Sequence, residues 1–379
     1  MTSPTSKQSI PKRIALVGPL PPPAGGMANQ TVQLAALLRR EGLAVELVQV
    51  NTPYRPAWIG KLRGVRALFR LASYIPKLWT VAGHVSLFHV MANSDWSWHL
   101  LAAPAIWISW LRGTPVVVNY RGGRAEAFFR RAWPVVRLTL KRSDVITVPS
   151  PYLKDVFACR HITTVVVPNI IDLSLFRRSR SETEPSCYRK GHPHLVVARN
   201  LEPIYDIATA LRAFSLICQD YPGAHLTVAG AGPERHSLES LASELGISQT
   251  VTFTGSIANK DMAILYREAD LVLNPSRVDN MPISILEALA SGVPVVSTNV
   301  GGIPHLVQDG QTALLVPPQS PFEMARAALT LLRDSKIASF LTDKGRAYAE
   351  QFAWRNVRER LFDAYRLALA GSQVEGAQP

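Results

Sequence analysis

The sequence predicts an α/β fold with two doubly wound, Rossmann-like domains. Short β-branched runs alternate with helical segments along the chain, which is typical of parallel sheets with helices on both faces. A polar stretch without periodicity interrupts this pattern near the middle. The length of 379 residues also favours two domains, because one domain usually holds about 100–200 residues.

The first domain is expected at residues 1–180. It opens with a strand in KRIALVG, a loop in PLPPPAGGMA, a helix over residues 29–42 with Asn29 as its cap, and a second strand in AVELVQV. This strand, glycine loop, helix and strand form the basic unit of a parallel sheet. Further strands are predicted in VSLFHV, PVVVNY, DVITVPS and TTVVVPN.

A linker is expected at residues 181–193, within the polar stretch RRSRSETEPSCYRKGHPH. A second domain follows at residues 194–353, with strands predicted in HLVVAR, HLTVAG, VTFTG, DLVLNPS, PVVSTN and TALLVPP and helices between them. An amphipathic helix at residues 354–371 returns to the first domain. Two such domains usually hold a ligand at the carboxyl ends of their strands, so we expect them to face a central cleft.

The composition separates the two halves by charge. Residues 1–180 carry 24 Lys and Arg against seven Asp and Glu, whereas residues 181–379 carry 17 against 21. A basic half attracts nucleic acid, anionic lipid or a phosphorylated substrate. Three scattered cysteines exclude a disulfide framework, and together with the lack of a signal peptide they favour the cytoplasm. The most apolar segment, LLAAPAIWISWL, is too short to span a membrane.

Residues 274–302, NPSRVDNMPISILEALASGVPVVSTNVGG, place Asp279 in a loop eight residues before Glu287. This stretch resembles the signature of the retaining GT-B glycosyltransferases of family four, in which an acid, seven intervening residues and a Glu precede A-x-A-x-G-x-P-V-V. Asp279 stands where that family usually has Glu. VTFTG, LYREADLVLNPS, GGIPHLVQDG and TALLVPP occur in the family's order, so the resemblance covers nearly the whole chain.

The resemblance implies a site for a nucleoside diphosphate sugar. Carboxylates bind the hydroxyls of such a donor, while cations and backbone amides bind its phosphates. Glu287 would accept hydrogen bonds from the ribose, and Asp279 with the backbone of Asn280, Met281 and Pro282 would hold the transferred sugar. The helix that follows would direct its positive end at the diphosphate. From the residues alone, Glu287 can also be an acid that caps this helix.

Arg199 in HLVVARN matches the family arginine that neutralises the departing diphosphate, and a surface ion pair is its alternative role. The family places a lysine a few residues later, where this chain has Ile204 or Tyr205, and the next basic residue is Arg212. One cation for the diphosphate is therefore missing or comes from elsewhere in the fold.

Gly25 and Gly26, in GPLPPPAGG, match the family's glycine-rich loop after the first strand. They would let the backbone approach the donor phosphate or the acceptor, and a tight structural turn is the alternative.

Two polar positions, Arg121 and His305, depart from the family pattern, and His89 is a further polar candidate. Arg121 stands where the family often has a histidine, and it would contact a phosphate or the acceptor, or serve as a structural arginine. His89 would contact the acceptor or a phosphate, or make an ordinary hydrogen bond. His305 replaces the more usual Glu in GGIPHLV, where Gly301 and Gly302 would still offer amides to a sugar or phosphate.

The basic residues of the first half are spaced among Leu, Phe and Trp in residues 59–79, and a Trp-rich segment follows; they are Lys61, Arg63, Arg66, Arg70 and Lys77. A helix of this kind lies on anionic bilayers when its apolar face is exposed, and otherwise packs on the sheet with a solvated basic face. We expect peripheral association with the inner face of the plasma membrane. No nucleic-acid partner is expected, because no recognisable reading module accompanies the basic residues.

The function implied is the metal-independent, retaining transfer of a sugar to an acceptor, with the leaving phosphate helping to deprotonate the acceptor hydroxyl. The expected acceptor is a lipid-linked saccharide of cell-surface polysaccharide biosynthesis. No cofactor is expected besides the donor as co-substrate, and no Asp-x-Asp pair suggests a metal. Two alternatives stay open. One is a nucleotide-sugar epimerase or hydrolase of the same fold, and the other is a non-catalytic partner that binds nucleotide sugar or lipid.

Overall fold

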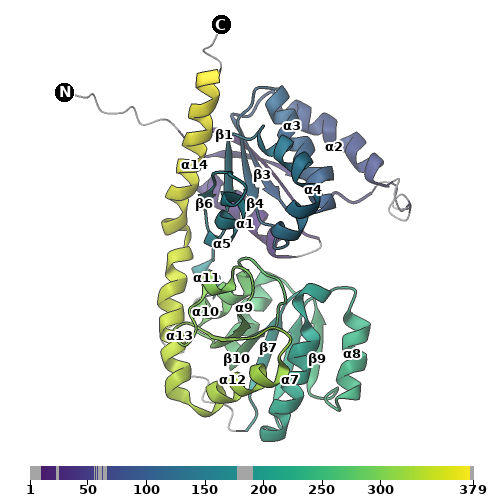
Figure 1. Ribbon diagram of the computed structural model, residues 1–379, viewed down its shortest axis with the longest axis vertical. Helices are drawn as coiled ribbons and strands as arrows, with labels where there is room; N and C mark the ends of the chain where they lie inside the picture. Colours follow the sequence, from purple (N-terminus) through teal and green to yellow (C-terminus); the bar gives the residue numbers. More distant parts are fainter. Residues whose placement is uncertain are drawn as a thin grey trace, which may run out of the picture. The chain divides into compact units, whose positions relative to one another are not determined.

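The computed structural model describes residues 10–22, 25–54, 56, 58, 62, 66–176 and 191–375, with side chains as far as residue 371. The chain forms two compact units (Figure 1). The first comprises Met1–Pro22, Met27–Pro168 and Val357–Pro379, and the second comprises Pro23–Gly26 and Asn169–Asn356. Most of the expected linker, residues 181–190, lies outside the described residues.

The first unit is built on a six-stranded parallel sheet in the order β2-β1-β3-β4-β5-β6. Its central strands are buried on both faces, which explains why they read as continuous apolar runs rather than as alternating ones. The strands are β1 (Arg13–Gly18), β2 (Ala44–Gln49), β3 (Leu87–Ala92), β4 (Val116–Tyr120), β5 (Val145–Val148) and β6 (Val165–Val166).

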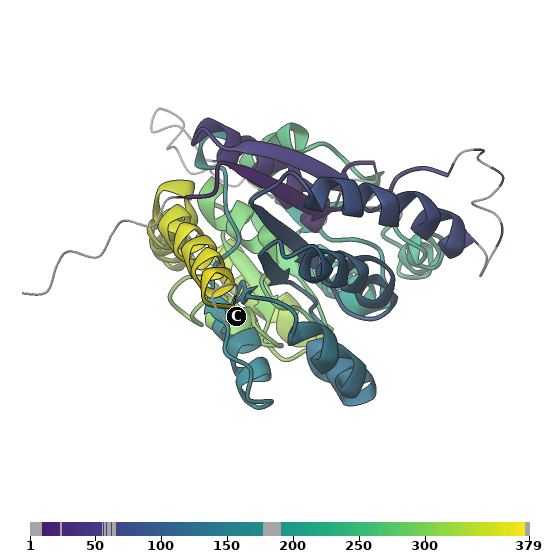
Figure 2. The same ribbon diagram turned by 90° about the horizontal axis from the view of Figure 1, so that it is seen from above.

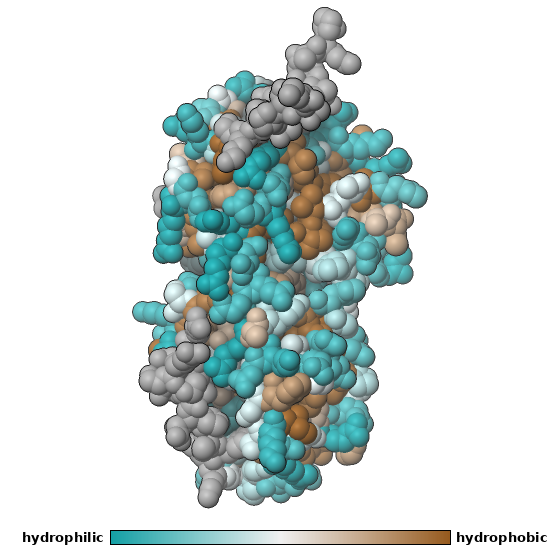
Figure 3. All heavy atoms as spheres, turned by 90° about the vertical axis from the view of Figure 1, so that its left-hand side faces the viewer, coloured by the Kyte–Doolittle hydropathy of each residue, from teal (hydrophilic) through white to brown (hydrophobic). Residues whose placement is uncertain are grey.

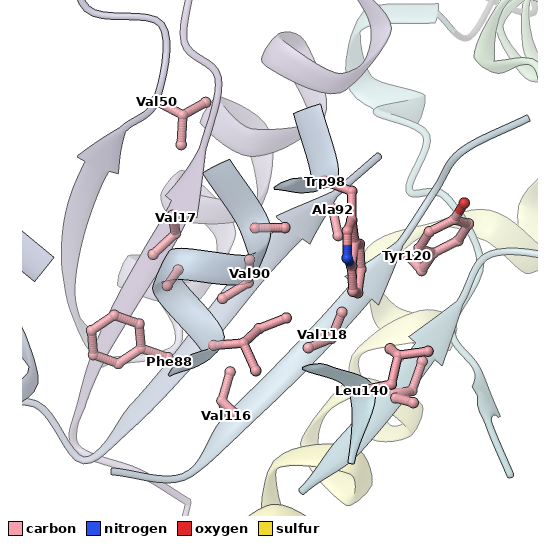
Figure 4. Packing of buried hydrophobic residues seen from close by; sticks show 14 of the residues in the cluster. Val17, Val50, Phe88, Val90, Ala92, Trp98, Val116, Val118, Tyr120 and Leu140 are labelled. Carbon is pink, nitrogen blue, oxygen red and sulfur yellow. The ribbon is translucent and has the colours of Figure 1, made fainter. Parts of the chain in front are cut away.

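Helices cover both faces of this sheet. Phe88, Val90, Val116 and Val118 point into one core, where they meet Trp98 and side chains of α2 to α5 (Figure 4). Figures 1 and 2 show α2, α3 and α4 on this face and α14 on the other. The helices are α1 (Gly26–Arg40), α2 (Arg66–Ala82), the π-helix η2 (Trp98–Ala102), α3 (Ala103–Leu111), α4 (Ala125–Leu140), α5 (Pro151–Ala158) and α14 (Trp354–Glu375).

The second unit has a six-stranded parallel sheet in the order β12-β11-β10-β7-β8-β9. Alternate residues of β7 serve two cores: Leu195 and Val197 face α7, α8 and α12, whereas Val196 faces α9 and α10. The strands are β7 (His194–Ala198), β8 (His225–Ala229), β9 (Val251–Gly255), β10 (Leu271–Asn274), β11 (Val295–Thr298) and β12 (Leu314–Val316).

Most helices of the second unit lie between these strands along the chain, whereas α6 precedes β7 and the last three follow β12. They are α6 (Leu173–Phe176), the 3₁₀-helix η4 (Pro203–Tyr205), α7 (Ile207–Asp220), α8 (Arg235–Glu244), α9 (Asn259–Glu268), α10 (Ile283–Ser291), α11 (Ile303–Leu306), α12 (Pro321–Arg333), α13 (Ser335–Ala349) and the 3₁₀-helix η5 (Glu350–Phe352).

Two boundaries differ from the sequence expectation. The first unit breaks off at Pro168 rather than at residue 180, because the following segment bonds to the second unit: the Asn169 amide donates to the Met281 carbonyl at 2.8 Å. Helix α1 begins at Gly26, so Asn29 lies inside the helix rather than at its cap.

Helix α14 starts at Trp354, as expected, and its part from Val357 belongs to the first unit. On the side of the protein drawn in Figure 3, which is the left-hand side of Figure 1, hydrophilic residues predominate and hydrophobic ones form small groups. None of the described helices combines the length and apolarity needed to cross a membrane.

Candidate functional site

The strand order of the second sheet marks one position as a ligand site. Counted from β7, the order is that of a dinucleotide-binding domain, and it reverses between β7 and β10. Ligands of such sheets bind beyond the carboxyl ends of the strands at this reversal. Arg199 directly follows β7, and Asp279 lies in the loop that follows β10. The two residues that the sequence singles out therefore meet at this position.

Arg199 holds this cluster together. Its Nη2 pairs with Asp279 Oδ2, its Nη1 donates to Ser284 Oγ at 3.4 Å, and its guanidinium carbon lies 4.1 Å from the centroid of the Tyr205 ring. Burial lowers the pKa of Arg199. Its buried Nε has no hydrogen-bond partner among the described residues. The ion pair is mostly buried, with side-chain exposures of 10% and 12%, so the surface role left open for Arg199 does not apply.

The loop that carries Asp279 is fixed by its own polar groups. The Ser276 hydroxyl donates to Asp279 Oδ2 at 3.3 Å, and the backbone amide of Asn280 donates to Asp279 Oδ1 at 2.8 Å. Thr298, at the end of β11, donates to the Ser276 carbonyl at 2.6 Å. Such bonds hold a carboxylate in one orientation before a ligand arrives.

The paired glycines after β11 pack against this loop. The Gly302 amide donates to the Asp279 carbonyl at 3.0 Å, and a Cβ at Gly302 would lie 2.0 Å from the Asn280 carbonyl oxygen. Gly301 has a φ of +53°, and a Cβ there would lie 2.1 Å from the Asp279 carbonyl oxygen. The Gly302 amide is therefore already bonded, contrary to the expectation that it would be offered to a sugar or phosphate.

Glu287 is buried inside α10 rather than placed in its first turn. The Tyr266 hydroxyl, from α9, donates to Glu287 Oε2 at 3.2 Å. Burial raises the pKa of Glu287 to about 8, although the Tyr266 hydrogen bond and the positive charge of Arg199 both lower it. Its position excludes the capping role left open by the sequence. Burial disfavours the ionised form of this acid, and acids with a pKa perturbed in this way are typical of functional sites.

The structure supplies a basic neighbour for the position without a lysine. The Arg277 amide donates to the Ile204 carbonyl at 2.8 Å, so the loop after β10 lies directly against η4. Arg277 is exposed. The sequence does not reveal this neighbour, because Arg277 lies in the Asp279 loop, far along the chain from position 204.

Gly25 and Gly26 group with the second unit, and Gly26 is the first residue of α1. Neither glycine has a positive φ, and a Cβ at Gly25 would meet no atom within 4 Å. Neither backbone conformation nor close packing within the described chain therefore requires glycine at position 25.

In the first unit, His89 has a structural role. It is fully buried in β3, where the Asn119 amide nitrogen lies 3.2 Å from Nε2 and the Tyr365 hydroxyl lies 2.9 Å from Nδ1. Burial and then the charge of Arg121 lower its pKa to about 3, so the ring is neutral. The acceptor or phosphate contact expected for His89 is therefore corrected to the hydrogen-bonded alternative, because no part of the ring reaches the surface.

Arg121 follows β4 and is half-buried, with its amide donating to the Ala92 carbonyl at 2.9 Å. Burial lowers its pKa to about 10, so it stays charged at neutral pH. Its place beyond the carboxyl end of β4 is compatible with the predicted phosphate or acceptor contact. Within the described residues, no three His, Cys, Asp or Glu side chains gather as a metal site would require.

Two family models match the chain. The model for "Glycosyltransferase Family 4" matches residues 24–175, and the model for "Glycosyl transferases group 1" matches residues 182–348. Together they span both units.

In the aligned parts, about a third of the residues of this chain are identical to those of curated relatives. A GDP-mannose-dependent alpha-(1-6)-phosphatidylinositol monomannoside mannosyltransferase of Mycobacterium tuberculosis is 32% identical over 62% of this chain and 65% of its own length. A D-inositol 3-phosphate glycosyltransferase of Saccharomonospora viridis is 32% identical over 46% of this chain and 43% of its own length. The chain thus spans less than two thirds of either relative.

Solved structures resemble the whole chain. Sucrose-phosphate synthase from Thermosynechococcus elongatus has a TM-score of 0.76 at 22% identity, covering 97% of this chain and all of the other. The Anabaena protein HepE in complex with UDP has a TM-score of 0.71 at 19% identity, covering 93% and 98%. This likeness and the two parallel sheets confirm the GT-B fold class. With both of its units matched by family models, the chain belongs to the family 4 (group 1) glycosyltransferases.

Proposed function

We propose that this protein transfers a sugar from a nucleoside diphosphate sugar to an acceptor hydroxyl, with retention at the anomeric carbon. The observation that carries the proposal is the buried cluster of Arg199, Asp279 and Glu287 at the strand reversal of the second sheet. In this cluster a cation can bind the phosphates of the donor, and two acids can accept hydrogen bonds from its hydroxyls.

The Arg199–Asp279 ion pair suggests how the donor is received. A diphosphate that pairs with Arg199 competes with Asp279 and frees this carboxylate for the hydroxyls of the transferred sugar. The orphan Nε of Arg199 supplies a further donor. A guanidinium held in this place also stabilises the negative charge that grows as the nucleoside diphosphate leaves. The backbone of Asn280, Met281 and Pro282 borders the same position, and we assign it to the sugar.

The remaining donor contacts come from α10 and its neighbours. We assign Glu287 to the ribose hydroxyls and the positive N-terminus of α10 to the diphosphate, together with the backbone at Gly25 and Gly26. Arg277 takes the place of the lysine that the family has near position 204, because its backbone is bonded to Ile204 and its side chain is exposed.

We assign the acceptor to the first unit and infer that it is a lipid-linked saccharide used for cell-surface polysaccharide. The mycobacterial relative acts on a phosphatidylinositol mannoside, which supports a lipid acceptor. Peripheral binding at the inner face of the plasma membrane fits α2, which exposes Leu68, Phe69, Ile75 and Trp79 beside Arg66 and Lys77. No cofactor or metal is invoked: the leaving phosphate assists deprotonation of the acceptor hydroxyl.

Calorimetric titration of the purified protein with UDP, GDP, ADP and TDP tests the donor site. We expect one nucleotide to bind and Glu287→Ala to weaken it at least tenfold, because the ribose loses its acceptor. Arg277→Ala should also weaken binding, whereas Arg212→Ala, which removes an exposed arginine of α7, should not. Absence of binding by all four nucleotides, or an unchanged affinity in Glu287→Ala, would contradict the proposal.

A further inference from the structure

A groove of about 360 Å³ lies in the first unit, beside the N-terminal half of α2. This volume is within the range of roughly 300–1,000 Å³ that ligand sites occupy. Apolar atoms make up most of its lining, which includes Ala67, Leu71, Trp96, Leu100 and Leu101. None of the described residues that line it carries a carboxylate. A groove of this kind does not suit a free sugar, whose hydroxyls require many polar partners.

Part of the groove lining comes from a helix of a rare type. Leu100 and Leu101 belong to the π-helix η2, in which the Ala103 amide reaches back to the Trp98 carbonyl. π-Helical turns are rare and often occur at functional sites. The Tyr74 hydroxyl, from α2, donates to the Leu101 carbonyl at 2.9 Å and fixes α2 against η2. The groove is thus a built feature of two joined helices, and Figure 1 shows α2 next to α3, the helix that continues η2.

Two arginines give the apolar groove a positive side. Arg66 and Arg70, one turn apart on α2, both line it. The Arg70 guanidinium carbon lies 4.5 Å from the centroid of the Tyr54 ring, which holds the side chain at the groove. In the part of the chain that the structure describes, the buried Nε of Arg70 has no hydrogen-bond partner. Donors arranged in this way suit a phosphate or another oxyanion.

Large apolar side chains are exposed on the elements that form the groove. Trp96, which lines it, is 76% exposed, and Leu68 and Phe69 of α2 are 66% and 46% exposed. Large exposed apolar residues on the same segments as a groove favour an interaction site at this surface. Tryptophan is also favoured where a bilayer meets water.

We propose that this groove binds one anionic, phosphate-bearing lipid of the bilayer, with its hydrocarbon chain against Leu71, Leu100 and Leu101 and its phosphate at Arg66 and Arg70. The apolar lining matches the chain, and the two cations match the headgroup charge. This lipid would be the membrane-anchored part of the acceptor in the proposed function. Only its role as acceptor rests on that function.

Calorimetry of the full-length protein with dihexanoyl phosphatidic acid, used as a monomeric short-chain lipid, tests this site. We expect binding of one lipid per protein, weakened at least tenfold by Arg70→Gln and by Ala67→Trp, which fills the groove without changing its charge. Arg137→Gln removes an exposed arginine of α4 and should leave the affinity unchanged. Dihexanoyl phosphatidylcholine and inorganic phosphate should each bind at least tenfold more weakly, because the choline cation cancels the net charge of the first and the second has no hydrocarbon chain.

Several results would overturn the proposal. If Ala67→Trp binds the lipid with wild-type affinity, the hydrocarbon chain of the lipid does not lie in this groove. If Arg137→Gln loses as much lipid affinity as Arg70→Gln, the protein attracts the lipid only by its overall charge. Inorganic phosphate binding as tightly as the lipid would point to a free anion. Titration of the same variants with the nucleoside diphosphate separates this site from the donor site. Ala67→Trp should bind nucleotide normally, and lipid binding without nucleotide binding would uphold the groove while contradicting the proposed function.

Discussion

Glu287 links the acidity of the solution to the occupancy of the donor site. Burial raises its pKa to about 8, so the empty site holds mainly the protonated acid at neutral pH. Hydroxyls donate more strongly to a carboxylate than to a carboxylic acid. A ribose that donates to Glu287 therefore favours the ionised form, and binding lowers the pKa of Glu287 and releases a proton.

The affinity for the nucleoside diphosphate should consequently rise between about pH 7 and about pH 8 and level off above the pKa of Glu287. Calorimetry in two buffers of different ionisation enthalpy would measure both the affinity and the proton release. Glu287→Gln cannot titrate and should bind with little dependence on pH over this range. A wild-type affinity that is flat with pH, or that falls as the pH rises, would show that the ligand does not meet the Glu287 carboxylate.

Single residues were only partly predictable from the sequence. The family resemblance assigned Arg199 and Asp279 to one donor site, but their direct ion pair depends on the strand order, which the sequence does not state. The burial of His89 was not predictable, since its partner Tyr365 is far along the chain. Arg277 was missed for the same reason, because its neighbour Ile204 is reached only through a loop contact.

At the scale of elements, α14 is attached to the first unit by a polar contact inside an apolar interface. The Asn119 amide donates to Nε2 of His89, which leaves Nδ1 to donate to the Tyr365 hydroxyl. Around this contact, Leu361, Phe362 and Ala368 of α14 are buried. The amphipathic pattern predicted the helix, but the pattern does not identify the surface that covers its apolar face.

Tyr365→Phe should lower the free energy of unfolding of the first unit by about 1–3 kcal/mol, because it leaves the buried Nδ1 donor of His89 unpaired. Thermal unfolding followed by circular dichroism, with hydrogen exchange of the α14 amides, would measure the loss. Leu367→Ala, at a position on the same helix that is 55% exposed, should change the stability by about 0.5 kcal/mol or less. Equal stability of Tyr365→Phe and wild type would argue against this contact as an anchor of α14.

Strands were the most predictable elements, because fully buried parallel strands give continuous apolar runs between helices. Helix starts were less predictable. Asn29 suggested a cap, yet α1 already begins at Gly26, since neither Met27 nor Ala28 opposes a helix. The π-helix η2 left no signal in DWSWHLLA that separates it from an ordinary helical turn.

At the scale of the whole molecule, charge and chemistry are divided between the two halves of the chain. The basic excess falls in residues 1–180, whose groove and exposed apolar residues suit an anionic lipid. The donor cluster lies in the second unit, where acids are more frequent. This division could be predicted from composition and motif spacing. The lipid groove could not, because it depends on how α2 packs against η2.

Catalysis of sugar transfer can be measured as the passage of label from radioactive nucleotide sugars into a bacterial lipid extract. With GDP-mannose and the UDP, ADP and TDP sugars as donors, one donor should pass its sugar to the lipid with release of equal nucleoside diphosphate. Arg199→Ala should slow this transfer by about 10²-fold or more, because the leaving diphosphate loses its cation. Donor consumption without labelled lipid would instead indicate a hydrolase or epimerase, and donor binding without consumption would contradict catalysis altogether.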